Sequence, residues 1–80
     1  MRILDNDNDK SLKNIILYLT FDEAIEIIGA LENLIKNKDK NEHFHINDLE
    51  YIRELTITLY NAKDLSHFNE RSKKLINDEN

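Results

Sequence analysis

Residues 20–37 read TFDEAIEIIGALENLIKN, and this stretch decides the fold. Thr20 and Glu23 have the spacing of a capping box, in which the Thr20 hydroxyl accepts from the Glu23 N–H and the Glu23 carboxylate accepts from the Thr20 N–H. The sequence therefore predicts an amphipathic helix over about Asp22–Asn37. Its apolar side is predicted to carry residues at helical spacing: Ala24, Ile25, Ile27, Ile28, Leu31, Leu34 and Ile35. The opposite, solvated side is predicted to carry Glu26, Gly29, Ala30 and Asn33.

A strand is predicted just before this helix. Lys13–Leu19 is short and rich in Ile, Leu and Tyr, a composition that suits a strand. Arg2–Leu4 is predicted as another short strand. The run Asp5–Asp9 between them reads Asp-Asn-Asp-Asn-Asp, which is typical of a solvated turn. We therefore expect a hairpin in which the acidic run is the loop.

Two further strands are predicted after the helix. His43–Asn47 and Arg53–Tyr60 both alternate polar and apolar residues, the period of a half-buried strand. The two strands are close enough along the chain to pair antiparallel, around a turn at Asn47–Glu50. A short C-terminal helix is expected from about Ser66.

Together these elements predict an α+β fold. We expect a small two-layer domain in which one long amphipathic helix packs on a three- to four-stranded mixed sheet, in the order β-α-β-β plus a short C-terminal helix. The crossover from Lys13–Leu19 to His43–Asn47 is expected to be right-handed. Residues 1–80 are predicted to form a single domain, with residues 1–12 as an N-terminal segment and residues 77–80 as a frayed tail.

Composition excludes several classes of protein. The chain has 80 residues, a formal net charge of −5, one glycine and no cysteine. It therefore cannot contain a disulfide, a zinc–thiolate site or a cysteine nucleophile. No basic cluster is larger than Arg71, Lys73 and Lys74, which disfavours binding to DNA or RNA. The longest wholly apolar run, Ile15–Leu19, is too short to cross a bilayer, so we expect a cytoplasmic protein.

Three stretches resemble a family of small bacterial proteins without assigned function. They are Leu19–Ala24, His43–Ile46 and Glu54–Asn61, and the resemblance extends over about Lys13–Lys74. It implies the β-α-β-β element order and implies no activity, cofactor or partner.

The acidic run is a possible calcium site. Asp5, Asp7 and Asp9 match the alternating carboxylates that open an EF-hand loop. The pattern then fails, because Lys10 stands where the loop needs Gly and Ile16 stands where it needs a bidentate Glu. A solvated turn is therefore favoured.

His43 and His45 are a second possible metal site. Residues two apart on a strand point to the same face, and imidazole is a common ligand for transition metals. Such a site needs at least one more donor, for which Glu42 and His67 are candidates. Ordinary strand alternation also explains the pair, since it places these two polar side chains in water. No cofactor is predicted.

A single helix covers only one face of a sheet. The strand residues predicted to face the helix are Ile15, Leu17, Leu19, Phe44, Ile46, Leu55, Ile57 and Leu59. The other face, here called the helix-free face, is predicted to carry Ile16, Tyr18, His43, His45, Thr56, Thr58 and Tyr60. Aromatic side chains are enriched in protein interfaces, although an ordinary exposed sheet face also carries scattered hydrophobic residues.

The sequence offers no catalytic motif. Ser11, Ser66 and Ser72 lack the flanking glycines of a nucleophile elbow, and one glycine cannot form a glycine-rich phosphate loop. We therefore predict a small non-enzymatic protein-interaction module that forms a homodimer or other homo-oligomer through the helix-free face or a sheet edge. Two alternatives stay open: an acidic immunity- or inhibitor-type protein that neutralises a basic toxin, and a metal-binding or sensing domain that uses His43 and His45.

Overall fold

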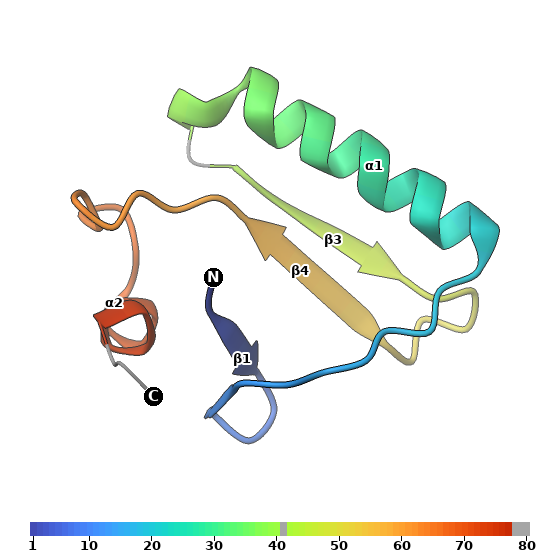
Figure 1. The fold of residues 1–80 in the computed structure, drawn as a ribbon, viewed down its shortest axis with the longest axis horizontal. Helices are drawn as coiled ribbons and strands as arrows, with labels where there is room; N and C mark the ends of the chain where they lie inside the picture. The colour runs from blue at the N-terminus through green and yellow to red at the C-terminus, as the bar shows by residue number, and fades with distance from the viewer. Residues whose placement is uncertain (41, 78–80) are drawn as a thin grey trace. The chain divides into compact units, whose positions relative to one another are not determined.

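A computed structural model describes residues 1–40 and 42–77 (Figure 1). The elements follow in the order β1 (Ile3–Asp5), β2 (Lys10–Leu12), α1 (Phe21–Lys36), the 3-10 turn η1 (Lys38–Lys40), β3 (His43–Asn47), β4 (Glu54–Thr58) and α2 (Glu70–Asn77). By its internal contacts the chain forms two compact units. Tyr18–Tyr60 is called here the helix–hairpin unit, and Met1–Leu17 with the chain from Asn61 onward is called the terminal unit. The α+β class is confirmed, and the prediction of a single domain stays a prediction.

Helix α1 begins where its capping box places it. The Glu23 N–H donates to the Thr20 hydroxyl at 3.2 Å, and the Thr20 N–H donates to the Glu23 carboxylate at 2.8 Å. At the other end the Asn37 N–H donates to the carbonyl oxygen of Asn33. Asp22 and Glu23 in the first turn and Lys36 in the last turn complement the helix dipole. The predicted bounds are correct to within one residue.

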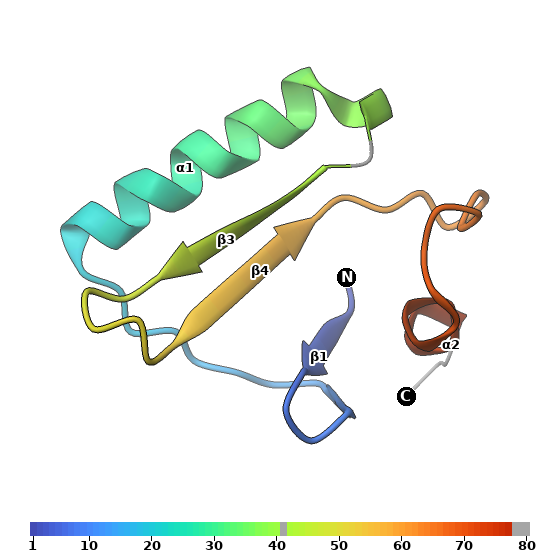
Figure 2. The ribbon, with the colours of Figure 1, turned by 180° about the vertical axis from the view of Figure 1, so that it is seen from behind.

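In the helix–hairpin unit, α1 lies alongside the β3–β4 hairpin and contacts both of its strands (Figures 1 and 2). β3 and β4 pair antiparallel as predicted, with Ile46 opposite Leu55 and Phe44 opposite Ile57. These four side chains are buried or half-buried, whereas their neighbours along each strand are mostly exposed. The alternation predicted from the sequence therefore sets which face of the hairpin meets α1.

The side of α1 that meets the hairpin differs from the prediction. Among the described residues the buried hydrophobic side chains are Ala30, Leu34 and Ile46. Ala30 was expected on the solvated side, whereas Ile28 and Ile35, expected in the core, are exposed. The apolar residues of α1 occupy more than half of its circumference, so their spacing does not specify which part faces the sheet. The structure buries the part that carries Ala30, where a small side chain lets the helix approach closely.

The predicted strand Lys13–Leu19 is wrong. β2 is Lys10–Leu12, and residues 14–20 follow without strand pairing. The hairpin forms upstream of the apolar run: Ile3 pairs with Leu12, and Asp5 pairs with Lys10. The predicted mixed sheet and its right-handed crossover are therefore absent from the described residues. The structure instead holds two separate antiparallel sheets of two strands each.

The C-terminal helix begins later than predicted. We expected it from about Ser66, but α2 starts at Glu70 because the Asn69 carboxamide oxygen accepts from the Ser72 N–H at 2.8 Å. Asn61–Asp64 forms a turn, as the break in the sequence pattern indicates. Of the predicted frayed tail, Asn77 is the last residue of α2, and residues 78–80 lie outside the described residues.

Gly29 in the middle of α1 provides a test of the helix geometry. A methyl group added at Gly29 would meet nothing within 4 Å. Gly29→Ala should therefore raise the free energy of unfolding by about 1 kcal/mol through helix propensity alone. Urea unfolding followed by circular dichroism, at one fixed protein concentration, measures this change.

The matched control is Ala30→Gly at the neighbouring buried position, which should lower the free energy of unfolding by at least about 1 kcal/mol. A Gly29→Ala variant that is less stable than the wild type would contradict the open surroundings of Gly29.

Candidate functional site

The helix-free face of the hairpin carries four of the seven predicted interface residues. The register places His43 opposite Thr58 and His45 opposite Thr56, and all four residues are exposed. Asn47 lies opposite Glu54 in the next pair on this face, so the Glu54 carboxylate is a neighbour of His45 and Thr56. The side chains of this face are therefore mainly polar: two imidazoles, two hydroxyls and one carboxylate.

His45 is the centre of a small polar cluster on this face. Its Nδ1 atom lies 2.8 Å from the Thr56 hydroxyl oxygen and 3.0 Å from a carboxylate oxygen of Glu54. The ring of His43 meets the ring of His45 edge-on, with 4.9 Å between the centroids. About half of the His45 and Glu54 side chains is exposed, so water screens the ion pair that a protonated His45 would form.

The cluster does not have the geometry of a catalytic relay. A hydroxyl–imidazole–carboxylate triad uses both ring nitrogens, one toward the nucleophile and one toward the acid. Here Thr56 and Glu54 both contact the same Nδ1 atom of His45. Within the described chain, no three His, Asp or Glu side chains gather as a metal site requires. The pair His43 and His45 therefore has no third donor in place there.

The other three predicted interface residues lie off the sheet. Ile16 and Tyr18 belong to the segment that forms no strand, and Tyr18 is 90% exposed. Tyr60 lies two residues beyond the end of β4 and is half-buried. Their placement on the helix-free face was wrong because it depended on a strand at Lys13–Leu19 and on a longer β4.

The acidic run of the terminal unit is a hydrogen-bonded turn. One Asp5 carboxylate oxygen accepts from the N–H groups of Asp7 and Asn8, and the other accepts from the Asn8 carboxamide. The Asn8 carboxamide is the main cause that lowers the pKa of Asp5. Arg71 donates to the Asn6 carboxamide oxygen at 2.7 Å and lies 3.7 Å from the Asp9 carboxylate. These contacts agree with the solvated turn rather than the calcium loop.

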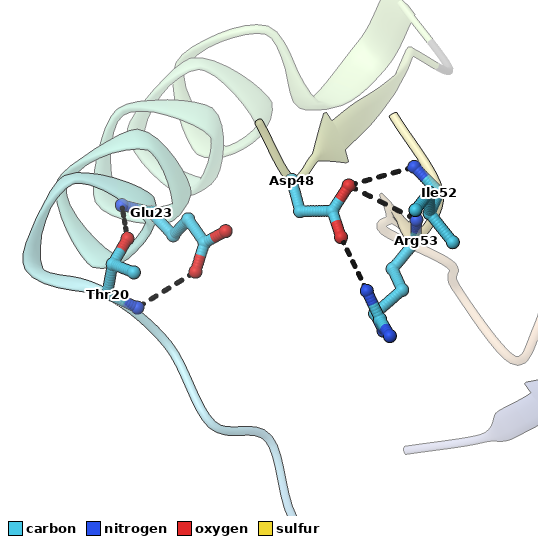
Figure 3. A network of polar contacts seen from close by, with 5 residues as sticks. All are labelled: Thr20, Glu23, Asp48, Ile52 and Arg53. Atoms are coloured by element: carbon cyan, nitrogen blue, oxygen red, sulfur yellow. Dashed lines mark hydrogen bonds and ion pairs between the residues drawn. The ribbon is translucent and has the colours of Figure 1, made fainter. Parts of the chain in front are cut away.

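Asp48 holds the turn between β3 and β4 (Figure 3). One of its carboxylate oxygens accepts from the N–H groups of Ile52 and Arg53, at 2.9 and 3.3 Å. The other oxygen lies 3.1 Å from the Arg53 guanidinium. The Ile52 N–H, helped by Arg53, lowers the pKa of Asp48. The sequence predicted a turn here but did not indicate that Asp48 organises it.

This turn presents apolar side chains to solvent. Leu49 is 97% exposed, and Tyr51 and Ile52 are also exposed. Tyr51 has a φ of 54°, a left-handed conformation that costs about 1–2 kcal/mol for a residue with a side chain of this kind. Asp48 maintains this conformation, since its carbonyl oxygen accepts from the Tyr51 N–H at 3.0 Å.

Helix α1 carries a second exposed apolar surface. Its residues belong to the apolar side of the helix that was predicted to face the sheet. We call it the outer stripe, and its members are Phe21, Ala24, Ile25, Ile28, Leu31 and Ile35. All but the half-buried Ala24 are exposed, and Phe21 and Ile35 are 78% and 65% exposed. Phe21, Ile28 and Ile35 are seven residues apart, and this spacing was the available signal for a distinct stripe.

The helix–hairpin unit has a small hollow at one end of α1. The hollow is lined by Leu34, Asn37, Lys38, Glu42 and Leu59 and has a volume of ≈ 10 Å³. That is room for about one water molecule, whereas small-molecule sites span about 300–1,000 Å³. Across residues 1–40 and 42–77, no helix has the length and apolarity that a membrane span requires.

The lowered pKa of Asp48 predicts how the turn responds to acid. Because folding lowers this pKa, the stabilisation by ionised Asp48 is present above the pKa of the unfolded chain and is lost as the pH falls through the folded pKa. Asp48→Ala should therefore be less stable than the wild type at about pH 6, and the difference should close toward about pH 2. Urea midpoints across this range measure it.

Glu50→Ala is the matched control, because it removes another exposed carboxylate from the same turn. It should change the urea midpoint less than Asp48→Ala does at about pH 6. A wild-type advantage over Asp48→Ala that persists undiminished in acid would contradict the role of the ionised carboxylate.

Comparison with known proteins gives no information on the function of this chain. The resemblance to a family of small bacterial proteins stays a prediction. No family model, no curated protein and no solved structure matches the sequence.

Proposed function

We propose that this chain is a non-enzymatic protein-interaction module that self-associates. The observation that carries the proposal is the balance of its hydrophobic side chains. In the described chain three hydrophobic residues are buried, whereas sixteen large ones are exposed. Single exposed hydrophobic residues are ordinary, but contiguous ones such as the outer stripe are typical of surfaces that bind a partner.

The energetics of a small domain favour such a partner. A two-stranded hairpin is marginally stable alone and needs a further layer, here provided by α1. A side chain of the size of Ile or Phe gains about 1.5–3 kcal/mol when it is fully removed from water. Because Phe21, Ile28 and Ile35 forgo most of this gain in the single chain, association would stabilise the fold as well as serve its function.

The exposed apolar side chains are not on the helix-free face. That face carries His43, His45, Thr56 and Thr58, which are polar, and its strands have unpaired outer edges in the described chain. Within the helix–hairpin unit, most of the exposed large apolar side chains lie on α1 and on the turn that Asp48 holds. The run Ile15–Leu19 before α1 is exposed as well. The proposed self-association is therefore supported most by the surface of α1.

Sedimentation equilibrium of the purified wild-type chain over a wide range of concentration tests the proposal. We expect a mass that approaches twice 9.5 kDa as the concentration rises. The same chain in concentrated urea provides the monomer reference. A chain that stays monomeric at the highest concentration reached would refute self-association.

A further inference from the structure

The outer stripe of α1 is a surface that a partner helix could cover. We propose that a second copy of this chain covers the outer stripe, with the two α1 helices packed side by side and antiparallel. This inference rests on the proposed self-association and assigns the surface that performs it.

The spacing of the outer stripe is that of a helix-pairing seam. Phe21, Ile28 and Ile35 repeat every seven residues, and Ala24 and Leu31 fall three residues after the first and second of them. This a/d pattern faces a neighbouring helix along its whole length, over two heptads. Two such helices cross at about 20° with interlocking side chains. The hairpin covers a different side of α1, through Ala30 and Leu34, so both contacts can exist together.

The outer stripe offers large apolar side chains to an interface. Ile25 and Ile28 are 52% and 54% exposed, and Phe21 and Ile35 are exposed further still. Leu31 is 39% exposed, so all five large side chains of the stripe keep a substantial part of their surface in water. A standard interface buries about 800 Å² on each partner, of which the rim is polar. The exposed Glu32, seven residues after Ile25, can supply part of that rim.

Charge selects the antiparallel orientation. The first turn of α1 is acidic, with Asp22 and Glu23, whereas its last turn carries Lys36 and the following turn carries Lys38 and Lys40 beside one acid, Asp39. An antiparallel pair brings each acidic end against the basic end of the other copy and also opposes the two helix dipoles. A parallel pair would place like charges together at both ends.

The same orientation matches individual side chains. Asp22, Gly29 and Lys36 are seven residues apart and lie outside the seam, toward the solvated side of α1. An antiparallel pair of identical helices has a two-fold axis across the seam. With the axis between Ile28 and Leu31, the small Ala24 lies opposite the large Ile35.

Cysteine pairing tests the orientation. The chain has no cysteine of its own, so each introduced thiol is unique. A mixture of Phe21→Cys and ¹⁵N-labelled Ile35→Cys should cross-link with a short bismaleimide reagent to a product of intermediate mass. Phe21→Cys alone should cross-link far less, because the two thiols would lie about 25 Å apart at roughly 1.5 Å per residue. Glu26→Cys, on the opposite side of α1, is the control and should not cross-link.

A charge in the stripe tests the surface. Ile28→Glu should weaken the dimer at least about tenfold in Kd, because the carboxylate would be buried in the seam. Asn33→Glu adds the same charge on the solvated side of α1 and should change Kd by less than about twofold. Both positions are exposed in the single chain, so both variants should keep the wild-type circular dichroism spectrum.

The outcomes separate the two proposals. Efficient cross-linking of Phe21→Cys to itself would overturn the antiparallel orientation. A wild-type dimer that Ile28→Glu does not weaken would overturn the assignment to the outer stripe and leave self-association standing. If the wild type is monomeric and the thiol of the Phe21→Cys variant resists modification, the chain covers its own stripe, and both proposals would fall.

Discussion

The width of the β3–β4 hairpin is the constraint on which the helix–hairpin unit depends. Two strands span about 10 Å, whereas a helix with its side chains is about 10–12 Å across and is apolar here around more than half of its circumference. The hairpin therefore buries one side of α1, through Ala30 and Leu34 against Ile46. Within the helix–hairpin unit, the outer stripe is left in water because the hairpin contacts a different side of α1. The candidate function follows from this mismatch.

Where packing does not set the limits of an element, polar side chains do so by binding the backbone. Thr20 and Glu23 start α1, Asn69 starts α2, and Asp48 closes the β3–β4 turn. In each case a side-chain oxygen accepts from backbone N–H groups that the element leaves without a partner. Such contacts are local and exposed, so they define geometry more than they add stability.

The features that could be predicted from the sequence are the ones with local causes. The start of α1 follows from Thr20 and Glu23, and the β3–β4 pairing follows from strict alternation and a short connection. The strand at Lys13–Leu19 could not be decided in this way, because a strand needs an edge to pair with and the hairpin register uses Lys10–Leu12 instead. The choice of Ala30 over Ile28 for the core, and with it the outer stripe, depends on the width of the sheet. Sequence periodicity carries no information about that width.

The central claim is that the fold of α1 is completed by a second copy of the chain. It is tested most directly by the urea midpoint of the wild type at protein concentrations that differ by about a hundredfold. If folding and association are coupled, mass action makes the folded state more stable at higher concentration, and the midpoint should rise. A midpoint that is the same at every concentration would contradict the claim.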